Sequence, residues 1–568
     1  MEQPDEEHPP VFEDDDVKDV VVNGSSPTEL NYNGDEPLSL QIPDIVVVNG
    51  DGADSPSGSA RLSQPSPARN LSSSAGGLFV SAPGKIILFG EHAVVYGRTA
   101  IAGSIDLRTY VSLFTSADGR IYLSLPDLDV EKTWMLKDLV RAGERLASEH
   151  PIDDAQPPSL ELLVPLARKL SGSCEDQCGV QHLAILAFWY VLLGVAHRKS
   201  SEKQKAAAAG GDAAGDAAGG MDLLAVKMTV RFDLPSCVGL GSSGAYCVCI
   251  VTALLQSSGL IPAPTIVADG EGNLTWEDEH LDMIRKWAAA AESLIHGRAS
   301  GLDAAVCTYG GVATFKPGTR IEHLKNLPDL RVILVNTKVE RNTSRMVSAV
   351  KERMKQFPRV VDGIFTTIDE ISLTASRILG KPTGEENGEP ETSAPPTPLL
   401  NGGGGDAIDH RSLQPTSGSV RSSSLSSYYA GGKRDSCASA ISGCSTKGEL
   451  IDTFTKLNDL CRINNQMLIA LGVGHPKVEQ ICTLLARYGI HPKMTGAGGG
   501  GSVFAFLKPD TPATLLEMIK QELEKLGYDV WQPPLGGPGV VEHTRRPPLF
   551  ASAPASTAQS TPSIQRSH

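Results

Sequence analysis

The sequence has few aromatic residues, dilute cysteines and no long apolar run. Aromatic residues make up 5% of the 568 positions, while glycine and proline number 57 and 38, so we expect a chain that is globular in part and disordered in part. Ten cysteines are too few for a disulfide scaffold and favour free thiols in a reducing compartment. The longest apolar run, residues 183–196, is too short to span a bilayer and predicts a buried helix. These features predict a cytoplasmic protein without a membrane partner.

Basic side chains are not gathered in any part of the sequence. The formal net charge is −15, but residues 1–60 hold 15 acidic side chains against one lysine, so the rest of the chain is nearly neutral. A protein whose main partner is nucleic acid normally carries a basic patch or stripe. We therefore expect no nucleic-acid partner, and an acidic extension in front of a nearly neutral folded part.

Several stretches are rich in Gly, Ser, Pro, Ala or acidic residues and too poor in apolar residues to offset the entropy of the chain. What remains is long enough for two domains, each with its own core. The expected division is a disordered acidic extension at 1–75, a first domain at 77–325 with a low-complexity loop at 200–221, a second domain at 326–545 with a disordered insertion at 383–447, and a disordered tail at 546–568.

Strand and helix signals are mixed along the foldable chain without a strict strand–helix–strand repeat, which predicts an α+β fold. Strands are expected at 78–81, 107–114, 121–125, 225–232, 331–335, 502–507 and 528–531. Helices are expected at 247–255, 280–295, 451–471 and 478–488.

A glycine-rich segment at 234–244, with the sequence LPSCVGLGSSG, lies between an expected strand and an expected helix. Glycines let the backbone turn tightly and approach a ligand closely. A helix that begins at Ser242 or Ser243 would point its free N–H groups and the positive end of its dipole at the loop, which suits a polyphosphate. The spacing is not that of the usual P-loop, and taken alone the segment is explained equally well as a glycine-rich turn with a serine cap.

Two further motifs bring a lysine and a histidine. SAPGK at 81–85 is followed by GEHAVVYG at 90–97. Lys85 comes after a Pro-Gly turn, from which its side chain can reach a phosphate or an anionic base. Taken alone, Lys85 is more simply a solvated turn lysine, and His92 a structural histidine with satisfied hydrogen bonds.

Two carboxylates lie on either side of an expected helix end at His296-Gly297. Glu292 and Asp303 can converge, so that one holds Mg²⁺ while the other accepts a proton. The alternative is a helix-end glutamate and an aspartate cap on the next helix. Farther along, TGAGGGG at 495–501 precedes a strand and indicates close backbone packing, a ligand-facing loop or a flexible hinge.

Taken together and in this order, the motifs resemble those of the GHMP small-molecule kinases. Within that superfamily the chain is most similar to the mevalonate kinases of eukaryotes, on the strings NTKVERNT at 336–343 and ALGVGH at 470–475 and on the run 80–95. The resemblance covers roughly residues 77–545 apart from the two low-complexity insertions. It therefore takes in nearly all of the foldable chain.

The resemblance implies a fold, an activity and a set of ligands. The fold would be a two-domain α+β GHMP kinase fold, with a first domain like the second domain of ribosomal protein S5, a ferredoxin-like second domain and the active site in the cleft between them. The activity would be transfer of the γ-phosphoryl group of ATP to the 5-hydroxyl of mevalonate, in the route to isoprenoids and sterols. Mg²⁺ would be the cofactor. A homodimer and feedback inhibition by isoprenoid diphosphates are implied as well.

The resemblance also implies a role for each matching residue. Asp303 would be the general base, and Lys85 would orient it and stabilise charge near the hydroxyl. Ser243 and Glu292 would hold Mg²⁺. ATP contacts are implied at Lys85, Asp127, Cys237, Val238, Gly239, Leu240, Gly241, Ser242 and Ser243. Contacts to mevalonate are implied at His92, Arg341, Thr343 and Asp303.

The chain departs from the family pattern near the nucleotide. Ser236-Cys237 replaces the usual Pro-Gly before the phosphate loop, and Gly244 replaces an alanine, which should cost some helix stability. Phe232 stands where a serine is usual and Asp127 where an asparagine is usual. Asp127 adds a negative charge near the nucleotide.

Two other interpretations stay open at this stage. The chain could be another GHMP kinase, acting on phosphomevalonate, galactose or homoserine, although the 336–343 segment and the GEHAVV string disfavour this. It could also be a catalytically silent relative that serves as a binding or regulatory module. The presence of Lys85, Ser243, Glu292 and Asp303 together argues against a silent relative.

Overall fold

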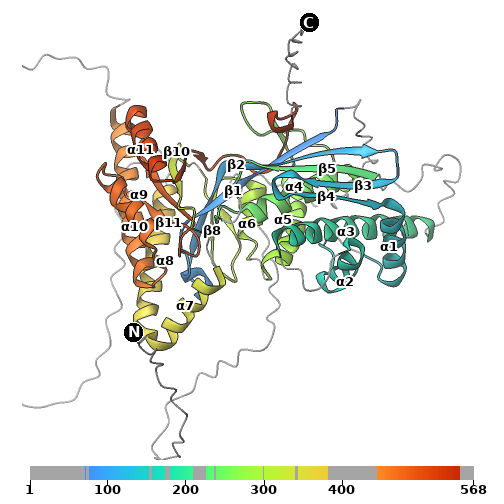
Figure 1. Cartoon of the computed structure of the whole chain (residues 1–568), viewed down its shortest axis with the longest axis horizontal. Helices are drawn as coiled ribbons and strands as arrows, with labels where there is room; N and C mark the ends of the chain where they lie inside the picture. The colour runs from blue at the N-terminus through green and yellow to red at the C-terminus, as the bar shows by residue number, and fades with distance from the viewer. Residues whose placement is uncertain are drawn as a thin grey trace, which may run out of the picture. The chain divides into compact units, whose positions relative to one another are not determined.

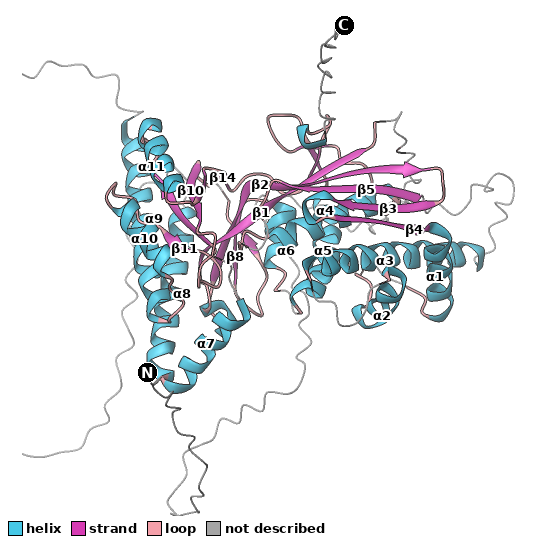
Figure 2. Cartoon of the chain, viewed as in Figure 1, coloured by secondary structure: helices cyan, strands magenta, loops and turns pink. Residues whose placement is uncertain are grey.

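The computed structural model describes residues 71, 76–152, 156–172, 179–208, 225–235, 238–297, 300–325, 327–339, 343–380 and 444–550. Helices and strands are mixed within this part of the chain, which confirms the expected α+β class (Figure 2). Cys237 and Arg341 lie outside the described residues, as do residues 1–70 and most of the 383–447 insertion.

A twisted antiparallel sheet organises the first half of the chain. Strands β1 (Leu78–Phe89) and β2 (Ala100–Ser116) pair along most of their length. On the other side of β2 lies β5 (Ala225–Phe232), followed by β3 (Arg120–Leu125), which runs parallel to β5, and then β4 (Val130–Met135). Helices α3 (Val180–Ala208), α4 (Ser242–Ser257), α5 (Asp278–His296) and α6 (Leu302–Tyr309) lie on one face of this sheet (Figure 1).

The second half of the chain is built around β10 (Leu330–Asn336) and its antiparallel partner β12 (Ser502–Leu507). Both faces of β10 are covered: Val332 and Leu334 belong to the core of the first half, whereas Ile333 and Val335 belong to a separate core. Side chains from α8 (Pro358–Leu379), α9 (Cys444–Ala470), α10 (Pro476–Ala486) and α11 (Ala513–Lys525) complete that second core. A strand buried on both faces reads as a continuous apolar run, which is why it is recognisable in the sequence.

One sheet joins the two halves. The short strand β14 (Pro534–Leu535) pairs with β10 on one side and with β2 on the other, where Leu535 lies opposite Ile105. The remaining helices are α1 (Leu136–Glu149), α2 (Leu160–Ser171), α7 (Thr343–Gln356) and the short turns η2 (Ala93–Tyr96), η3 (Pro126–Leu128) and η4 (Pro548–Phe550). The remaining strands are β6 (Ile266–Val267), β7 (Leu274–Thr275), β8 (Val312–Phe315), β9 (Glu322–His323), β11 (Lys493–Met494), β13 (Asp529–Trp531) and β15 (Val541–Glu542).

The expected strands and helices overlap observed elements of the same kind, although residue 528, residue 471 and residues 487–488 lie just outside β13, α9 and α10. Four boundaries of the expected low-complexity segments were wrong. Residues 200–208 continue α3 instead of joining a loop: Ser200 and Ser201 are buried, and the exposed residues 203–208 consist of Lys, Gln and Ala, which are good helix formers. Leu71, assigned to the extension, is buried, and its carbonyl accepts a hydrogen bond from the Thr115 N–H. The helix α9 begins at Cys444, inside the predicted insertion. Residues 546–550 are placed against the sheet, where the rings of Phe79 and Phe550 lie 5.9 Å apart.

Helix α3 contains the longest apolar run of the sequence. Within the described part of the chain it is the one helix that is long and apolar enough to cross a membrane. Most of the apolar stretch of this helix is buried inside the protein. Phe188, Trp189 and Tyr190 are buried side by side, and Tyr190 donates a hydrogen bond to the carbonyl of Pro158. A helix that is apolar all round belongs in a core, as the sequence predicted.

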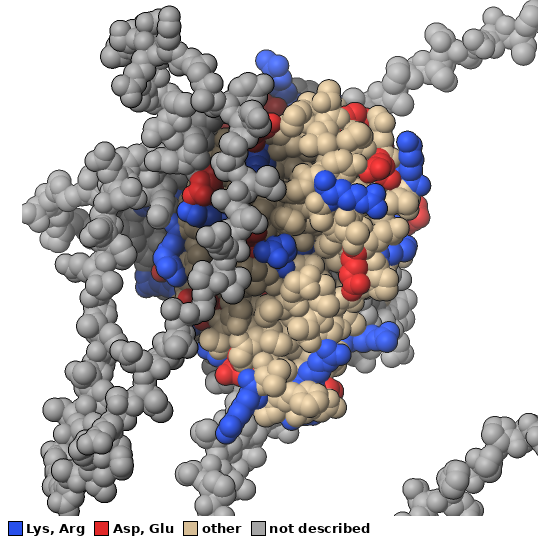
Figure 3. All heavy atoms as spheres, turned by 90° about the vertical axis from the view of Figure 1, so that its left-hand side faces the viewer, with Lys and Arg blue, Asp and Glu red and all other residues tan. Residues whose placement is uncertain are grey.

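Charged side chains of both signs are interspersed on the surface of the second half. In the view of Figure 3, which faces the side with the helices of that half, blue and red side chains alternate among tan ones without a coloured area of one sign. This mixture is typical of a solvated protein surface.

A buried ion pair links the GEHAVV motif to the second half. Lys493 Nζ contacts Glu91 Oε1, and both side chains are almost completely inaccessible, at 0% and 1%. Lys493 also donates to the carbonyl of Met494, Asn464 donates to Glu91, and the ammonium lies 5.2 Å from the ring centre of Phe504. A buried pair is costly to break because the remaining charge has neither water nor a partner.

We expect Lys493→Met to lower the free energy of unfolding by about 3–5 kcal/mol, because it leaves the Glu91 carboxylate buried and unpaired. The double variant Glu91→Leu/Lys493→Met should lose less than the single variant, since no buried charge is left. Urea denaturation measures both. Lys338→Met is the matched control: Lys338 is half-exposed in its ion pair with Asp529, so its loss should stay below about 1 kcal/mol. Equal losses for Lys493→Met and Lys338→Met would contradict the assignment.

Candidate functional site

The glycine-rich segment joins β5 to α4, as the sequence predicted. Helix α4 begins at Ser242, and Gly241 before it adopts a left-handed conformation with φ of 74°. The first N–H groups of such a helix have no partner within the helix and carry the positive end of its dipole. The loop and the helix start therefore form a concave, electropositive backbone surface.

Strand β1 lies directly against this loop. The Lys85 N–H donates a 2.8 Å hydrogen bond to the carbonyl of Leu240. A Cβ atom on Gly84 would lie 2.7 Å from that carbonyl oxygen, and one on Gly241 would lie 2.8 Å from Lys85 Cγ. The two glycines therefore permit an approach that any larger residue would prevent. The sequence analysis expected a turn at Pro83-Gly84. The structure has no turn there: the two residues are part of β1, and the pairing register with β2 shifts between them.

The side chain of Lys85 meets Asp303 across the site. Lys85 Nζ lies 3.0 Å from Asp303 Oδ2, and the two side chains are 8% and 25% exposed. Asp303 sits in the first turn of α6, after Gly301 in a left-handed conformation. The sequence analysis left open that Asp303 caps this helix, but the N-cap is Gly301, and the Asp303 carboxylate is directed to Lys85 instead.

Ser243 and Glu292 form a second group beside this pair. Ser243 Oγ donates a 3.0 Å hydrogen bond to Glu292 Oε1. Burial of Glu292, and secondly the negative charge of Asp303, raise the pKa of Glu292 to about 8. Gly244 packs between the carboxylates, since a Cβ atom there would lie 3.0 Å from Asp303 Cβ and 3.4 Å from Glu292 Oε1. Ser243 Oγ and the Glu292 carboxylate thus provide neighbouring oxygen ligands. A cation bound to them would stabilise the charged form of Glu292.

His296 belongs to this group although the sequence analysis gave it no role. Its Nε2 lies 2.9 Å from Ser243 Oγ, and it lines the same cavity as Ser243. The signal was present in the sequence: His296 follows Glu292 by four residues, and a spacing of four places two side chains on the same face of a helix.

Lys85, Ser243, His296 and Asp303 line one cavity of about 410 Å³, whereas the buried Glu292 accepts a hydrogen bond from Ser243 without lining that cavity. Polar groups on its wall come from Lys85, Ser242, Ser243, His296 and Asp303, and the backbone of Gly239 and Gly241 completes that side. The rest of the wall is largely apolar, formed by Leu128, Val180, Leu183, Ala184, Phe232, Leu234, Pro235, Tyr246 and Ile295. Val238 and Leu240 are in the loop but do not line the cavity.

Asp127 also lines the cavity, and its charge is partly neutralised. Its Oδ2 accepts a 2.9 Å hydrogen bond from the Phe232 N–H and lies 3.2 Å from Arg231 Nε. Phe232 lines the cavity next to it. The two residues that depart from the family pattern are therefore in contact with each other, and the added negative charge has a cationic partner that the sequence analysis missed.

The residues implied on the mevalonate side are less close together. His92 is buried with φ of 60°, and its Nε2 lies 2.8 Å from the carbonyl of Ala497. Burial lowers the pKa of His92. Thr343 is the exposed first residue of α7. Neither residue lines the cavity that contains Lys85 and Asp303, so their role stays a prediction.

The TGAGGGG segment packs tightly against the second half. A Cβ atom on Gly499 would lie 2.6 Å from Met346 Sδ, and one on Gly500 would lie 2.6 Å from Val339 Cγ1. Thr495 Oγ1 accepts from the Ile87 N–H and donates to the Ile87 carbonyl, which ties the segment to β1. Of the three expectations for these glycines, the described contacts favour close backbone packing.

Comparison with known proteins first defines the class. The family model for the GHMP kinases N terminal domain matches residues 204–311, and the one for GHMP kinases C terminal matches residues 450–525. Both halves thus match one superfamily of small-molecule kinases, in the order that the motifs predicted.

Curated relatives narrow the class. The chain is 33% identical to the mevalonate kinase of Mus musculus over 467 residues, which covers 82% of this chain and 95% of the mouse protein. It is 33% identical to the Bos taurus enzyme, over 86% of this chain and 99% of that protein. It is 34% identical to the Homo sapiens enzyme, over 82% and 95%. The chain belongs to the mevalonate kinase family.

We expect Gly241→Ala to destabilise the protein more than a change at an open left-handed glycine. Gly119 has a similar φ of 69°, and a Cβ atom added there would meet nothing within 4 Å, so Gly119→Ala should cost about 1–2 kcal/mol from backbone conformation alone. Gly241→Ala adds the contact with Lys85 Cγ and should lose more. Urea denaturation of both variants gives the comparison, and equal losses would mean that the loop is not held against β1.

Proposed function

We propose that this chain transfers the γ-phosphoryl group of ATP to the 5-hydroxyl of (R)-mevalonate, giving 5-phosphomevalonate and ADP. The observation that carries the proposal is the convergence of Lys85, Ser243 and Asp303 on one cavity, with the buried Glu292 hydrogen-bonded to Ser243, in a chain that aligns with nearly the full length of mammalian mevalonate kinases. Such a product lies in the mevalonate route to isoprenoids and sterols.

The nucleotide is proposed to bind along the cavity. The glycine loop and the start of α4 would hold the phosphates, because backbone N–H groups and the helix dipole favour anions there. The apolar wall around Leu128, Phe232 and Ile295 suits the flat base. Cys237 and Arg341 are proposed contacts to phosphate and mevalonate, on the strength of the family resemblance.

Asp303 is proposed as the general base. The acceptor hydroxyl must lose a proton as it attacks, and Asp303 is the carboxylate of the cavity wall that Lys85 orients at 3.0 Å. The Lys85 ammonium also stabilises negative charge that develops on the transferred group. Phosphoryl transfer needs positioning and charge compensation more than covalent help, and these residues supply both.

Mg²⁺ is the proposed metal, held by Ser243 and Glu292 together with phosphate oxygens. The donor set fits: magnesium prefers hard oxygen ligands and is usually bound through one or two carboxylates plus phosphates. The buried Glu292 carboxylate, whose pKa is raised to about 8, would be stabilised in its charged form by a divalent cation. When bound, the metal neutralises charge on the phosphates and fixes their orientation.

The family resemblance supplies the remaining parts of the proposal. We propose a cytoplasmic enzyme that acts as a homodimer and is inhibited by isoprenoid diphosphates. The burial of α3 within the protein agrees with a chain that is not held in a membrane.

An ADP-release assay on the purified full chain tests the acceptor. With ATP and Mg²⁺, mevalonate should be turned over, whereas phosphomevalonate, galactose and homoserine should not. Preference for one of these three acceptors would assign another GHMP kinase activity. Folded protein that turns over none of the four would indicate a catalytically silent relative.

Asp303→Asn should reduce kcat by about 10²–10⁴-fold, because the hydroxyl proton loses its acceptor. The fold and ATP affinity should change little, since asparagine has nearly the same volume. Steady-state kinetics and nucleotide binding by calorimetry measure the two effects. A variant with the wild-type kcat would remove Asp303 from the role of base.

Glu292→Gln and Ser243→Ala should each raise the Mg²⁺ concentration that gives half-maximal rate, because each removes an oxygen ligand. Titration of Mg²⁺ at fixed ATP and mevalonate measures this concentration. Glu279→Gln is the matched control, an exposed glutamate in the first turn of the same helix, and should leave the Mg²⁺ dependence unchanged. If neither site variant differs from the control, the metal ligands lie elsewhere.

A further inference from the structure

His296 is the last residue of α5, and the reaction proposed above does not use it. Its Nε2 lies 2.9 Å from Ser243 Oγ, and the same hydroxyl donates a 3.0 Å hydrogen bond to Glu292 Oε1. Both His296 and Ser243 line the cavity that contains Asp303. The imidazole therefore contacts a side chain that is itself proposed to hold the metal.

One helix supplies both neighbours of Ser243. Glu292 and His296 lie four residues apart on α5, and side chains at that spacing stand on the same face of a helix. Ser243 is the second residue of α4, which packs against α5. Glu292 is buried and His296 is exposed, so the three groups run from the interior of the protein to its surface. The Ser243 hydroxyl is thus held between two side chains of the neighbouring helix.

The direction of the two hydrogen bonds follows from the number of protons. Glu292, in the charged form that a bound cation stabilises, can only accept, so it takes the single proton of the Ser243 hydroxyl. His296 must then donate, which assigns a proton to its Nε2. Ser243 Oγ keeps one further lone pair, and the two hydrogen bonds fix the direction in which that lone pair points.

The orientation of Ser243 matters because a serine side chain is otherwise free to turn. An unrestrained serine has three staggered rotamers, which direct Oγ to three different places. A side chain that is already ordered loses little conformational freedom when a ligand binds to it. With the His296 contact removed, the charged Glu292 is left to draw the hydroxyl toward itself, and the remaining lone pair has no fixed direction.

We propose that His296 is a positioning residue for the phosphoryl transfer. It holds Ser243 Oγ in the orientation from which Ser243 and Glu292 together bind the metal of the nucleotide complex. His296 acts through Ser243 and is not itself a metal ligand. The role rests on the proposed metal site, and it adds a residue that neither the motifs nor the family resemblance assigned.

Binding of Mn²⁺ to the full chain with saturating ADP tests this role without turnover. Mn²⁺ is the probe because its binding is followed directly by electron paramagnetic resonance. His296→Leu should raise the Kd of Mn²⁺ about threefold to tenfold, since one hydrogen bond to the ligand is lost. His296→Gln carries an amide N–H donor and should stay within about twofold of wild type.

A double-mutant cycle separates an action through Ser243 from a direct contact. Ser243→Ala/His296→Leu should bind Mn²⁺ no more weakly than Ser243→Ala alone, because no hydroxyl is left to orient. Losses that add in the double variant would mean that His296 contacts the metal or the nucleotide by itself, and would overturn the proposal.

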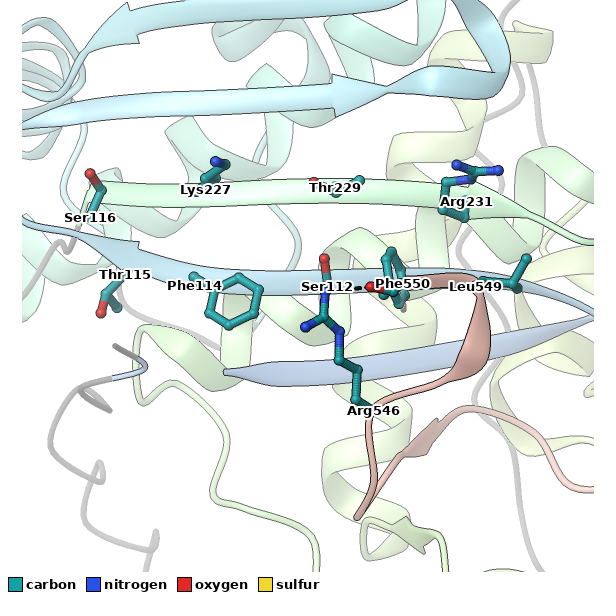
Figure 4. A pocket seen from close by; sticks show the side chains of 10 residues that line it. All are labelled: Ser112, Phe114, Thr115, Ser116, Lys227, Thr229, Arg231, Arg546, Leu549 and Phe550. Atoms are coloured by element: carbon teal, nitrogen blue, oxygen red, sulfur yellow. Dashed lines mark hydrogen bonds between the residues drawn. The ribbon is translucent and has the colours of Figure 1, made fainter. Parts of the chain in front are cut away.

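Two controls match the two substitutions. His280→Leu removes a histidine from the first turn of the same helix, outside the cavity lining. Ser112→Ala removes a serine hydroxyl from the face of β2 and β5 that is drawn in Figure 4, also outside that lining. Both controls should bind Mn²⁺ like wild type. A loss in His280→Leu as large as in His296→Leu would overturn the assignment.

Steady-state kinetics add a readout that a general loss of stability would not produce. His296→Leu should raise the KM for ATP and the Mg²⁺ concentration at half-maximal rate, while the KM for mevalonate stays within about twofold of wild type. An equal rise in both KM values would contradict a role confined to the metal and the nucleotide.

The remaining outcomes separate this role from the functions on which it rests. Wild-type Mn²⁺ affinity in His296→Leu, or binding by His296→Gln as weak as by His296→Leu, would overturn the role of His296 while Ser243→Ala still reports on the metal site. Unchanged binding in Ser243→Ala as well would overturn the metal site and the role of His296 with it. Because the binding assay contains no acceptor, neither result bears on the choice of mevalonate.

Discussion

The close approach of β1 to the glycine loop determines where the rest of the site lies. The Lys85 N–H binds the carbonyl of Leu240, and Gly84 and Gly241 leave room for the two backbones to touch. The first carbon atoms of the Lys85 side chain therefore lie at the start of α4, near Ser243. From there its ammonium reaches Asp303, which α6 presents from the other side. A side chain of any size at either glycine would separate the lysine from the loop, and the proposed phosphate-binding surface would lose its cation.

The second half of the chain supports the site without lining its cavity. Lys493 meets Glu91 in a buried ion pair, and Thr495 bonds to the backbone of Ile87. Ile87 is on β1 shortly after Lys85, and Glu91 follows the end of that strand, so the two contacts hold the GEHAVV motif to the glycine segment before β12. Burial of a charge pair costs desolvation energy that is recovered only with good geometry and further hydrogen bonds, which Asn464 and the Met494 carbonyl provide. The arrangement favours one relative position of the two motifs over all others.

The departures from the family pattern become understandable once their neighbours are known. Asp127 would place an unwelcome charge beside a nucleotide, but Arg231 and the Phe232 N–H take up part of it. Phe232 extends the apolar wall of the cavity. Its aromatic side chain would suit the base of the proposed nucleotide better than the hydroxyl of the usual serine. Arg231 and Phe232 are neighbours on β5 and so face opposite sides of the sheet, and Asp127 contacts both of them.

Local pattern in the sequence was enough for the elements that carry the site. The apolar run of β10, the alternation in β5 and the change from glycines to a helix at Ser242 depend on residues a few positions apart, so the sequence could predict them. The order of the four motifs was enough to indicate the kinase superfamily. Residues 200–208 were assigned wrongly from their low complexity: Lys, Gln and Ala are also good helix formers, and residues 203–208 continue α3 although they are exposed. The Lys493–Glu91 pair joins residues 402 positions apart, and the Arg231–Asp127 contact joins β5 to the short turn η3. Such contacts depend on how the strands are assembled into the sheet, so only the tertiary structure decides them. The charge and size of a side chain do not by themselves select one partner among the many residues along the chain.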